Sequence, residues 1–134
     1  MEMYKEFKRF FGNRSVSTDL LLYIQESKLE EDLVAFYPRN WFVDGKEPEM
    51  FVITKDDIIR VKRNHKVLDI EVFKDFKVTK LSYSENLQNR YTGSKLEITL
   101  QTGDKIFFNA SEDANEDWTE TFSQYIEEIF KTIK

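Results

Sequence analysis

The C-terminal segment, residues 113–134, has the apolar pattern of one long amphipathic helix. Apolar side chains recur at steps of three or four residues, and this spacing places on one helix face Trp118, Phe122, Ile126, Ile129 and Ile133. Asp113 followed by Glu116 resembles a capping box, so the helix is predicted to begin at Asp113. Its apolar face needs a surface to pack on, which we expect the preceding part of the chain to provide.

Two shorter helices are predicted in residues 1–30. The first has an apolar stripe and would end at a Gly12-Asn13 cap; the stripe consists of Met3, Tyr4, Phe7, Phe10 and Phe11. The second would begin at Ser17, with Val16 placed to pack on Leu21. It would run to about Ser27 and bury Leu20, Leu21 and Ile24. We interpret this hairpin as packed on the main body, and the alternative is a partner-binding surface.

From residue 33 the apolar period changes to two, which predicts seven strands joined mostly by short turns. The strands are expected at 33–43, 50–54, 58–62, 67–73, 76–84, 96–101 and 105–109. Pro38 cannot donate a ladder hydrogen bond, so the first strand should be interrupted or lie at an edge. A change of phase at Thr79-Lys80 predicts a β-bulge. The fourth strand alternates cleanly, with Leu68, Ile70 and Val72 on one face and Asp69 and Glu71 on the other.

Seven antiparallel strands followed by one helix with a tryptophan near its start resemble the pleckstrin-homology (PH) superfold. In particular, the chain is similar to bacterial PH-like domains, and we expect it to belong to an uncharacterised family of them. The similarity covers residues 33–134 and includes two hairpins. These are Phe51-Val52-Ile53-Thr54 with Ile58-Ile59-Arg60-Val61, and Leu96-Glu97-Ile98-Thr99-Leu100 with Ile106-Phe107-Phe108.

The length of 134 residues predicts a single domain, residues 1–134, and the resemblance implies a mainly β, α+β fold for it. Its body would be a seven-stranded antiparallel barrel or sandwich at 33–134, capped by the C-terminal helix and preceded by the helical hairpin at 1–30. Such folds host lipid binding, peptide binding and structural roles, so the fold alone does not decide the function. Phosphoinositide-binding members resemble one another in a basic cluster on the first hairpin loop. Here that loop, residues 44–49, has Lys46 against three acidic residues, which departs from their pattern.

The charge and the composition exclude several classes of partner. A net charge of −5 predicts repulsion from nucleic acid and from anionic membranes. The charged first residues do not resemble a signal peptide. The longest apolar run, Leu20 to Ile24, is far below the roughly 20 residues of a membrane span. With no cysteine in the chain, we expect a soluble cytoplasmic protein without an integral membrane segment.

The residues give little support for catalysis. His65 is the only histidine and lies in a predicted turn, and a zinc site needs three or four nitrogen or sulfur ligands. The four glycines are isolated, so no phosphate-binding loop is formed. Asp56-Asp57 also falls in a turn, where aspartate is favoured for conformational reasons. We predict no enzyme activity, no catalytic residue, no metal and no cofactor.

The candidate binding residues lie in a basic hairpin, residues 55–66, and at Trp41-Phe42. The hairpin has five basic residues against two acidic ones, a net charge of +3, and its candidate residues are Arg60, Lys62, Arg63, His65 and Lys66. It would bind an acidic partner, a phosphate-rich ligand or an anionic membrane, or it is a charged edge that discourages aggregation. Trp41 is either core beneath the N-terminal helices or an aromatic anchor for a partner.

Our leading hypothesis is protein–protein recognition, through a sheet edge or the groove beside the C-terminal helix. The alternative is peripheral attachment to an anionic membrane or phosphate-rich ligand through Lys55–Lys66. The identity of the partner and the oligomeric state, homo-oligomers included, do not follow from the sequence.

Overall fold

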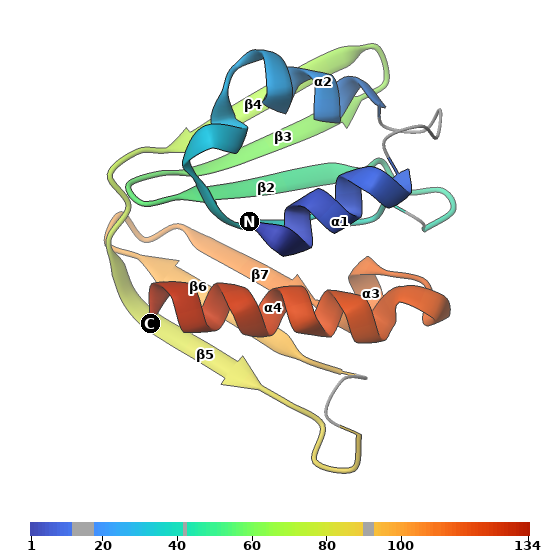
Figure 1. Ribbon diagram of the computed structural model, residues 1–134. Coiled ribbons are helices and arrows are strands. Elements are labelled where there is room, and N and C mark those ends of the chain that lie inside the picture. Colours follow the sequence, from blue (N-terminus) through green and yellow to red (C-terminus); the bar gives the residue numbers. More distant parts are fainter. Residues whose placement is uncertain (12–17, 42, 90–92) are drawn as a thin grey trace.

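The computed structural model describes residues 1–11, 18–41, 43–89 and 93–134 (Figure 1). It is an α+β structure with two antiparallel sheets and a long C-terminal helix. The first sheet has the order β1 (Leu33–Tyr37), β2 (Glu49–Thr54), β3 (Ile58–Asn64) and β4 (Val67–Phe73). The second has the order β5 (Val78–Ser84), β6 (Lys95–Leu100) and β7 (Lys105–Asn109). The seven described strands do not close into a barrel, because they form two separate sheets.

The helices are α1 (Glu2–Phe11), α2 (Thr18–Glu26), the short α3 (Ala110–Asp113) and α4 (Thr119–Ile133). Two 3-10 turns, Leu29–Asp32 and Glu116–Trp118, precede β1 and α4. In α2 the residues expected to be buried, Leu20, Leu21 and Ile24, are in the core, which confirms that this helix packs on the body. The predicted caps at Gly12-Asn13 and Ser17, and the contact of Val16, lie outside the described residues.

The centre of the first sheet is covered on both faces. On its inner face, toward the second sheet, Tyr37 and Phe51 contact Phe108 of β7 at ring distances of 4.4 and 5.0 Å. On its helix face, Phe36 contacts Tyr4 and Phe7 of α1 at 5.2 and 5.5 Å. Figure 1 shows α1 and α2 lying over this face. Every residue of β2 is therefore buried.

Helix α4 connects the two sheets. Its central stripe residues Phe122, Ile126 and Ile129 are buried, as the periodicity predicted, whereas Trp118 and Ile133 at the ends of the stripe are partly exposed. Outside the stripe, Tyr125 packs on Phe36 of β1 at a ring distance of 4.6 Å, and Phe130 stacks on Tyr83 of β5 at 4.6 Å. The helix thus bridges one edge strand from each sheet.

The predicted start of this helix is wrong. Asp113 is the last residue of α3, and α4 begins six residues later at Thr119. The Asp113 carboxylate is buried and accepts hydrogen bonds from the Tyr37 hydroxyl at 2.8 Å and the Asn109 backbone N–H at 2.9 Å. The carboxylate that the sequence pattern assigned to a helix cap is therefore hydrogen-bonded to β1, through Tyr37, and to the last residue of β7, Asn109.

Two predictions about strand irregularities are tested by the ladders. β1 is an edge strand, as expected from Pro38, but it ends at Tyr37 and not at residue 43, because proline cannot extend the ladder. The β5–β6 register shifts between Val78 and Lys80, which confirms the bulge. None of the helices in the described ranges is both long enough and apolar enough to cross a membrane.

Candidate functional site

The two arginines of the basic hairpin are held by carboxylates of neighbouring elements. Arg60 Nε donates to Glu49 of β2 at 2.5 Å, and its Nη1 lies 3.7 Å from Glu71 of β4. Arg63 pairs through Nε with Glu47 at 3.2 Å and through Nη1 with Asp19 of α2 at 3.7 Å. Strand alternation puts Arg60 on the inner face and Arg63 on the helix face, so the structure does not bring the two guanidinium groups together.

The remaining candidates of the hairpin are also separated. Lys62 is partly buried and lies between Glu49 and Asp69 in the cross-strand row of the inner face. His65 and Lys66 are exposed in the turn between β3 and β4, where His65 has a left-handed φ of 58°. Lys55 is exposed beyond the opposite end of β3. The most exposed cations are thus at the two ends of the hairpin.

Trp41 is buried beneath α1, with 4% of its surface exposed. Its ring contacts Phe7 at 4.9 Å, and its indole N–H donates to the Glu49 carbonyl at 3.0 Å. The Trp41 ring therefore packs the loop after β1 against α1. Phe42 lies outside the described residues.

A buried polar cluster that the sequence did not reveal lies between the sheets. Arg39 Nε is 3.6 Å from Asp113, its Nη1 is 4.0 Å from Glu49, and its Nη2 donates to the Phe107 carbonyl. Its guanidinium carbon also lies over the rings of Phe51 and Phe108, at 4.8 and 5.3 Å. The members come from distant segments, so no local motif could have indicated them.

In this cluster the positive charge of Arg39 is paired with the negative charges of Glu49 and Asp113. Burial and the adjacent Asp113 carboxylate raise the pKa of Tyr37 well above its usual value, so its hydroxyl remains a hydrogen-bond donor. A polar cleft of about 220 Å³ opens beside Arg39 and Arg60. Within the described ranges, no three His, Asp or Glu side chains converge in a way that would hold a metal ion.

Strand β4 differs from the rest of its sheet because most of its side chains are exposed, and only Leu68 and Phe73 near its ends are partly buried against the core. It pairs with β3 alone among the described strands, and Figure 1 shows it as the outermost strand. On the face predicted to be apolar, Ile70 and Val72 are 39% and 51% exposed and Leu68 is partly buried, in contrast with the wholly buried β2. The apolar face predicted for this strand is therefore largely open to solvent.

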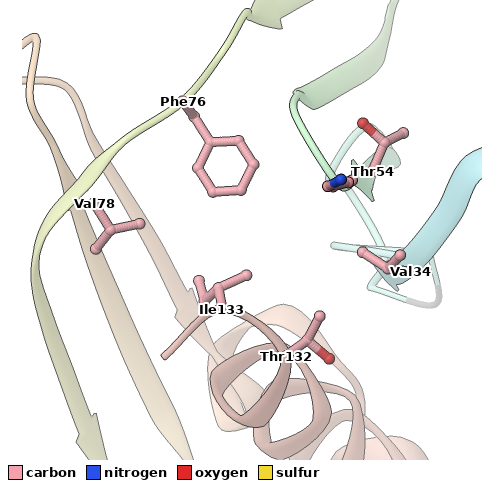
Figure 2. A pocket seen from close by; sticks show the side chains of 7 residues that line it. Val34, Thr54, Phe76, Val78, Thr132 and Ile133 are labelled. Carbon is pink, nitrogen blue, oxygen red and sulfur yellow. The ribbon is translucent and has the colours of Figure 1, made fainter.

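A groove of about 470 Å³ lies beside the C-terminal end of α4 (Figure 2). Apolar side chains from both sheets and from the helix point toward its interior: Val34, Phe76, Val78 and Ile133. Thr54, Thr132 and Lys55 complete its lining. Val34 is the extra residue at a register shift of the β1–β2 ladder, and such bulges redirect side chains. The structure thus offers a groove beside the C-terminal helix and a free sheet edge on another part of the molecule.

Comparison with known proteins gives one match. A family model described as "Protein of unknown function (DUF3908)" matches residues 13–124, which is most of the chain. The searches of curated proteins and of solved structures find no match.

Proposed function

The chain belongs to the DUF3908 family, and we propose that it is a non-catalytic binding module that takes a protein partner by strand addition at β4. We further propose that its strands have a PH-like arrangement. Four strands in one sheet, three in the next and a C-terminal helix across both support this assignment. The free edge of β4 is the observation on which the binding proposal depends.

Strand addition needs unpaired backbone groups together with side chains that can recognise the incoming strand. β4 provides seven residues of regular strand whose outer N–H and C=O groups have no ladder partner among the described strands. Long, apolar edges of this kind pair readily with other chains. Here Ile70 and Val72 stay exposed beside a strand, β3, whose Ile59 and Val61 are buried. An added strand would cover the exposed side chains of Ile70 and Val72.

The edge is preferred over the groove beside α4 because it offers two kinds of recognition at once. The groove is lined mainly by apolar side chains and two threonines, and among the described residues that line it Lys55 alone is charged. The edge combines backbone hydrogen bonds, which give affinity, with alternating side chains, which give specificity.

Attachment to an anionic membrane through Lys55–Lys66 is the alternative. It would require several cations on one surface, because each basic residue near an anionic membrane contributes only about 1 kcal/mol. Arg60 and Arg63 are paired within the molecule, and Lys55 and Lys66 lie at opposite ends of the hairpin. This distribution favours the protein partner.

The test is selection of random nine-residue peptides displayed on phage against the immobilised full chain. Selected peptides should slow amide hydrogen exchange in residues 67–73, because strand addition protects the outer N–H groups of β4. Ile70→Lys and Val72→Lys should each weaken peptide binding at least tenfold, since either change removes apolar surface from the edge.

Leu87→Lys is the matched control. It makes the same chemical change at a leucine that is 100% exposed in the loop after β5, so peptide affinity should not change. Failure to select any peptide, or protection confined to segments other than β4, would contradict the proposal. Salt-sensitive binding to vesicles that contain phosphatidylserine, lost in a Lys55→Glu/Lys66→Glu variant, would favour the membrane alternative.

A further inference from the structure

We infer that the strand recognised by β4 alternates apolar and basic residues. This inference rests on the proposed function, because it specifies the partner of the same edge. Its basis is that the two faces of β4 present different chemistry to any strand that pairs with it.

The helix face of β4 calls for apolar side chains. Cross-strand rows run from the buried core to this edge: Val52, Ile59 and Val72 form one row, and Met50, Val61 and Ile70 form the next. The β2 and β3 members of these rows are buried, whereas Ile70 and Val72 are exposed. A partner strand would extend each row by one residue, and an apolar side chain there would be shielded from water by its neighbours.

The inner face of β4 calls for basic side chains. One row runs Glu49, Lys62, Asp69, so that the sign of the charge alternates across the sheet and ends on an exposed acid. The next row contains Arg60 and Glu71. The Arg60 guanidinium lies 2.5 Å from Glu49 of the neighbouring row and 3.7 Å from Glu71. Asp69 and Glu71 therefore carry negative charge at the edge, and opposite charges directly across a strand pair are stabilising.

The same acids argue against a second copy of the chain as the occupant. In an antiparallel self-pairing centred on Ile70, Asp69 would face Glu71 of the other copy. Centring the pair on Asp69 or on Glu71 would place that acid opposite itself. Like charges directly opposite are destabilising, so every central register of a β4–β4 pair is penalised.

Three peptides separate the charge requirement from strand addition itself. The first is Lys-Val-Lys-Ile-Lys-Val-Lys; the second has Thr and the third has Glu at each Lys position. Fluorescence polarisation with the full chain should show the Lys peptide binding at least tenfold more tightly than the Thr peptide. The Glu peptide should not bind detectably.

Conservative variants test whether Asp69 and Glu71 are responsible. Asp69→Asn/Glu71→Gln should remove the preference for Lys over Thr, while the preference persists in the control Asp117→Asn/Glu120→Gln. The control removes the same charge from two exposed residues near the start of α4. Thermal melts of both variants would verify that they remain folded.

The outcomes distinguish the two proposals. If no peptide binds, strand addition itself fails. If the Lys and Thr peptides bind equally, only the charge inference is overturned. A block peptide of the same composition, with its lysines gathered at one end, should bind at least tenfold more weakly than the alternating one. Equal binding of the two would reveal non-specific attraction to the net negative protein and would also overturn the inference.

Discussion

At the scale of single residues, Asp113 joins its own segment, residues 109–113, to residues 37–40 at and after the end of β1. Its carboxylate accepts from Tyr37 of β1 and from the Asn109 backbone, and its carbonyl accepts from Asn40 N–H at 2.9 Å. Arg39 supplies the compensating positive charge at 3.6 Å. A buried carboxylate is tolerated only when it is paired and hydrogen-bonded, so each of these partners should matter for stability.

Tyr37→Phe should lower the free energy of unfolding by about 1–3 kcal/mol, because the buried Asp113 carboxylate loses one of its two hydrogen-bond donors. Tyr125→Phe is the matched control, since this tyrosine is also buried and its pKa is raised by burial and by the nearby Glu6 charge, not by a hydrogen bond. Its cost should stay within about 0.5 kcal/mol. Urea unfolding of both variants provides the comparison, and equal losses would show that the bond to Asp113 adds no stability.

At the scale of elements, α4 contributes most of its packing through its central turns. Ile126 is fully buried, whereas Ile133 at the end of the same stripe is partly exposed. The two residues have the same side chain and the same helix, and they differ mainly in burial. They therefore form a natural pair for measuring what the packing of this helix contributes.

Ile126→Ala should destabilise the protein by about 2–5 kcal/mol, because it removes buried methylenes and leaves a cavity. Ile133→Ala should cost less than about 1.5 kcal/mol, because solvent already reaches that side chain. Denaturant titration would measure both losses. A larger loss at Ile133 than at Ile126 would mean that the end of the helix, and not its centre, anchors it.

Periodicity predicted the elements well where a local pattern decides them. The stripe around Ile126, the strand at 67–73 and the bulge at Thr79-Lys80 all depend on side chains close in sequence. Contacts between different elements decided the rest. The Asp113 carboxylate is hydrogen-bonded to residues of β1 and β7, and Arg60 is hydrogen-bonded to Glu49 of the adjacent strand.

The candidate site was less accessible to sequence reasoning than the fold. The exposure of Ile70 and Val72 depends on where α2 and the second sheet end, which the alternation of β4 cannot show. Likewise, the five basic residues of the hairpin indicated a cationic surface. The structure shows that these residues are separated, because they lie on both faces of β3 and at both ends of the hairpin.

At the scale of the whole molecule, several tyrosines make stability sensitive to alkaline pH. Burial is the main cause that raises the pKa of Tyr4, Tyr37 and Tyr125 far above the usual value of 10.0. Burial, together with a hydrogen bond to Glu85, raises the pKa of Tyr83 to about 12. Each hydroxyl thus stays protonated in the folded protein at a pH at which the unfolded chain would lose that proton.

The sign of the effect follows from proton counting. Below pH 10 these groups contribute their full stability, and above it the unfolded state binds fewer protons, so the free energy of unfolding falls. Each of the three buried tyrosines, Tyr4, Tyr37 and Tyr125, should contribute a slope of about 1.4 kcal/mol per pH unit until its folded pKa is reached. Circular dichroism against pH would locate the transition, and tyrosinate absorbance should rise at the same pH. Ionisation well before unfolding would contradict the burial of these side chains.

The division of the strands into two sheets has a consequence for how the chain can be assembled. Every ladder joins strands that are consecutive in sequence, and no described strand crosses from residues 33–73 to residues 78–109. A backbone cut within residues 74–77 would therefore sever no ladder, and each fragment would retain its own sheet. The aromatic contacts of Phe108 with Tyr37 and Phe51, and those of α4 with β1, would guide the fragments back together. The two halves thus form a natural pair for fragment complementation, with the break placed where the chain passes from one sheet to the other.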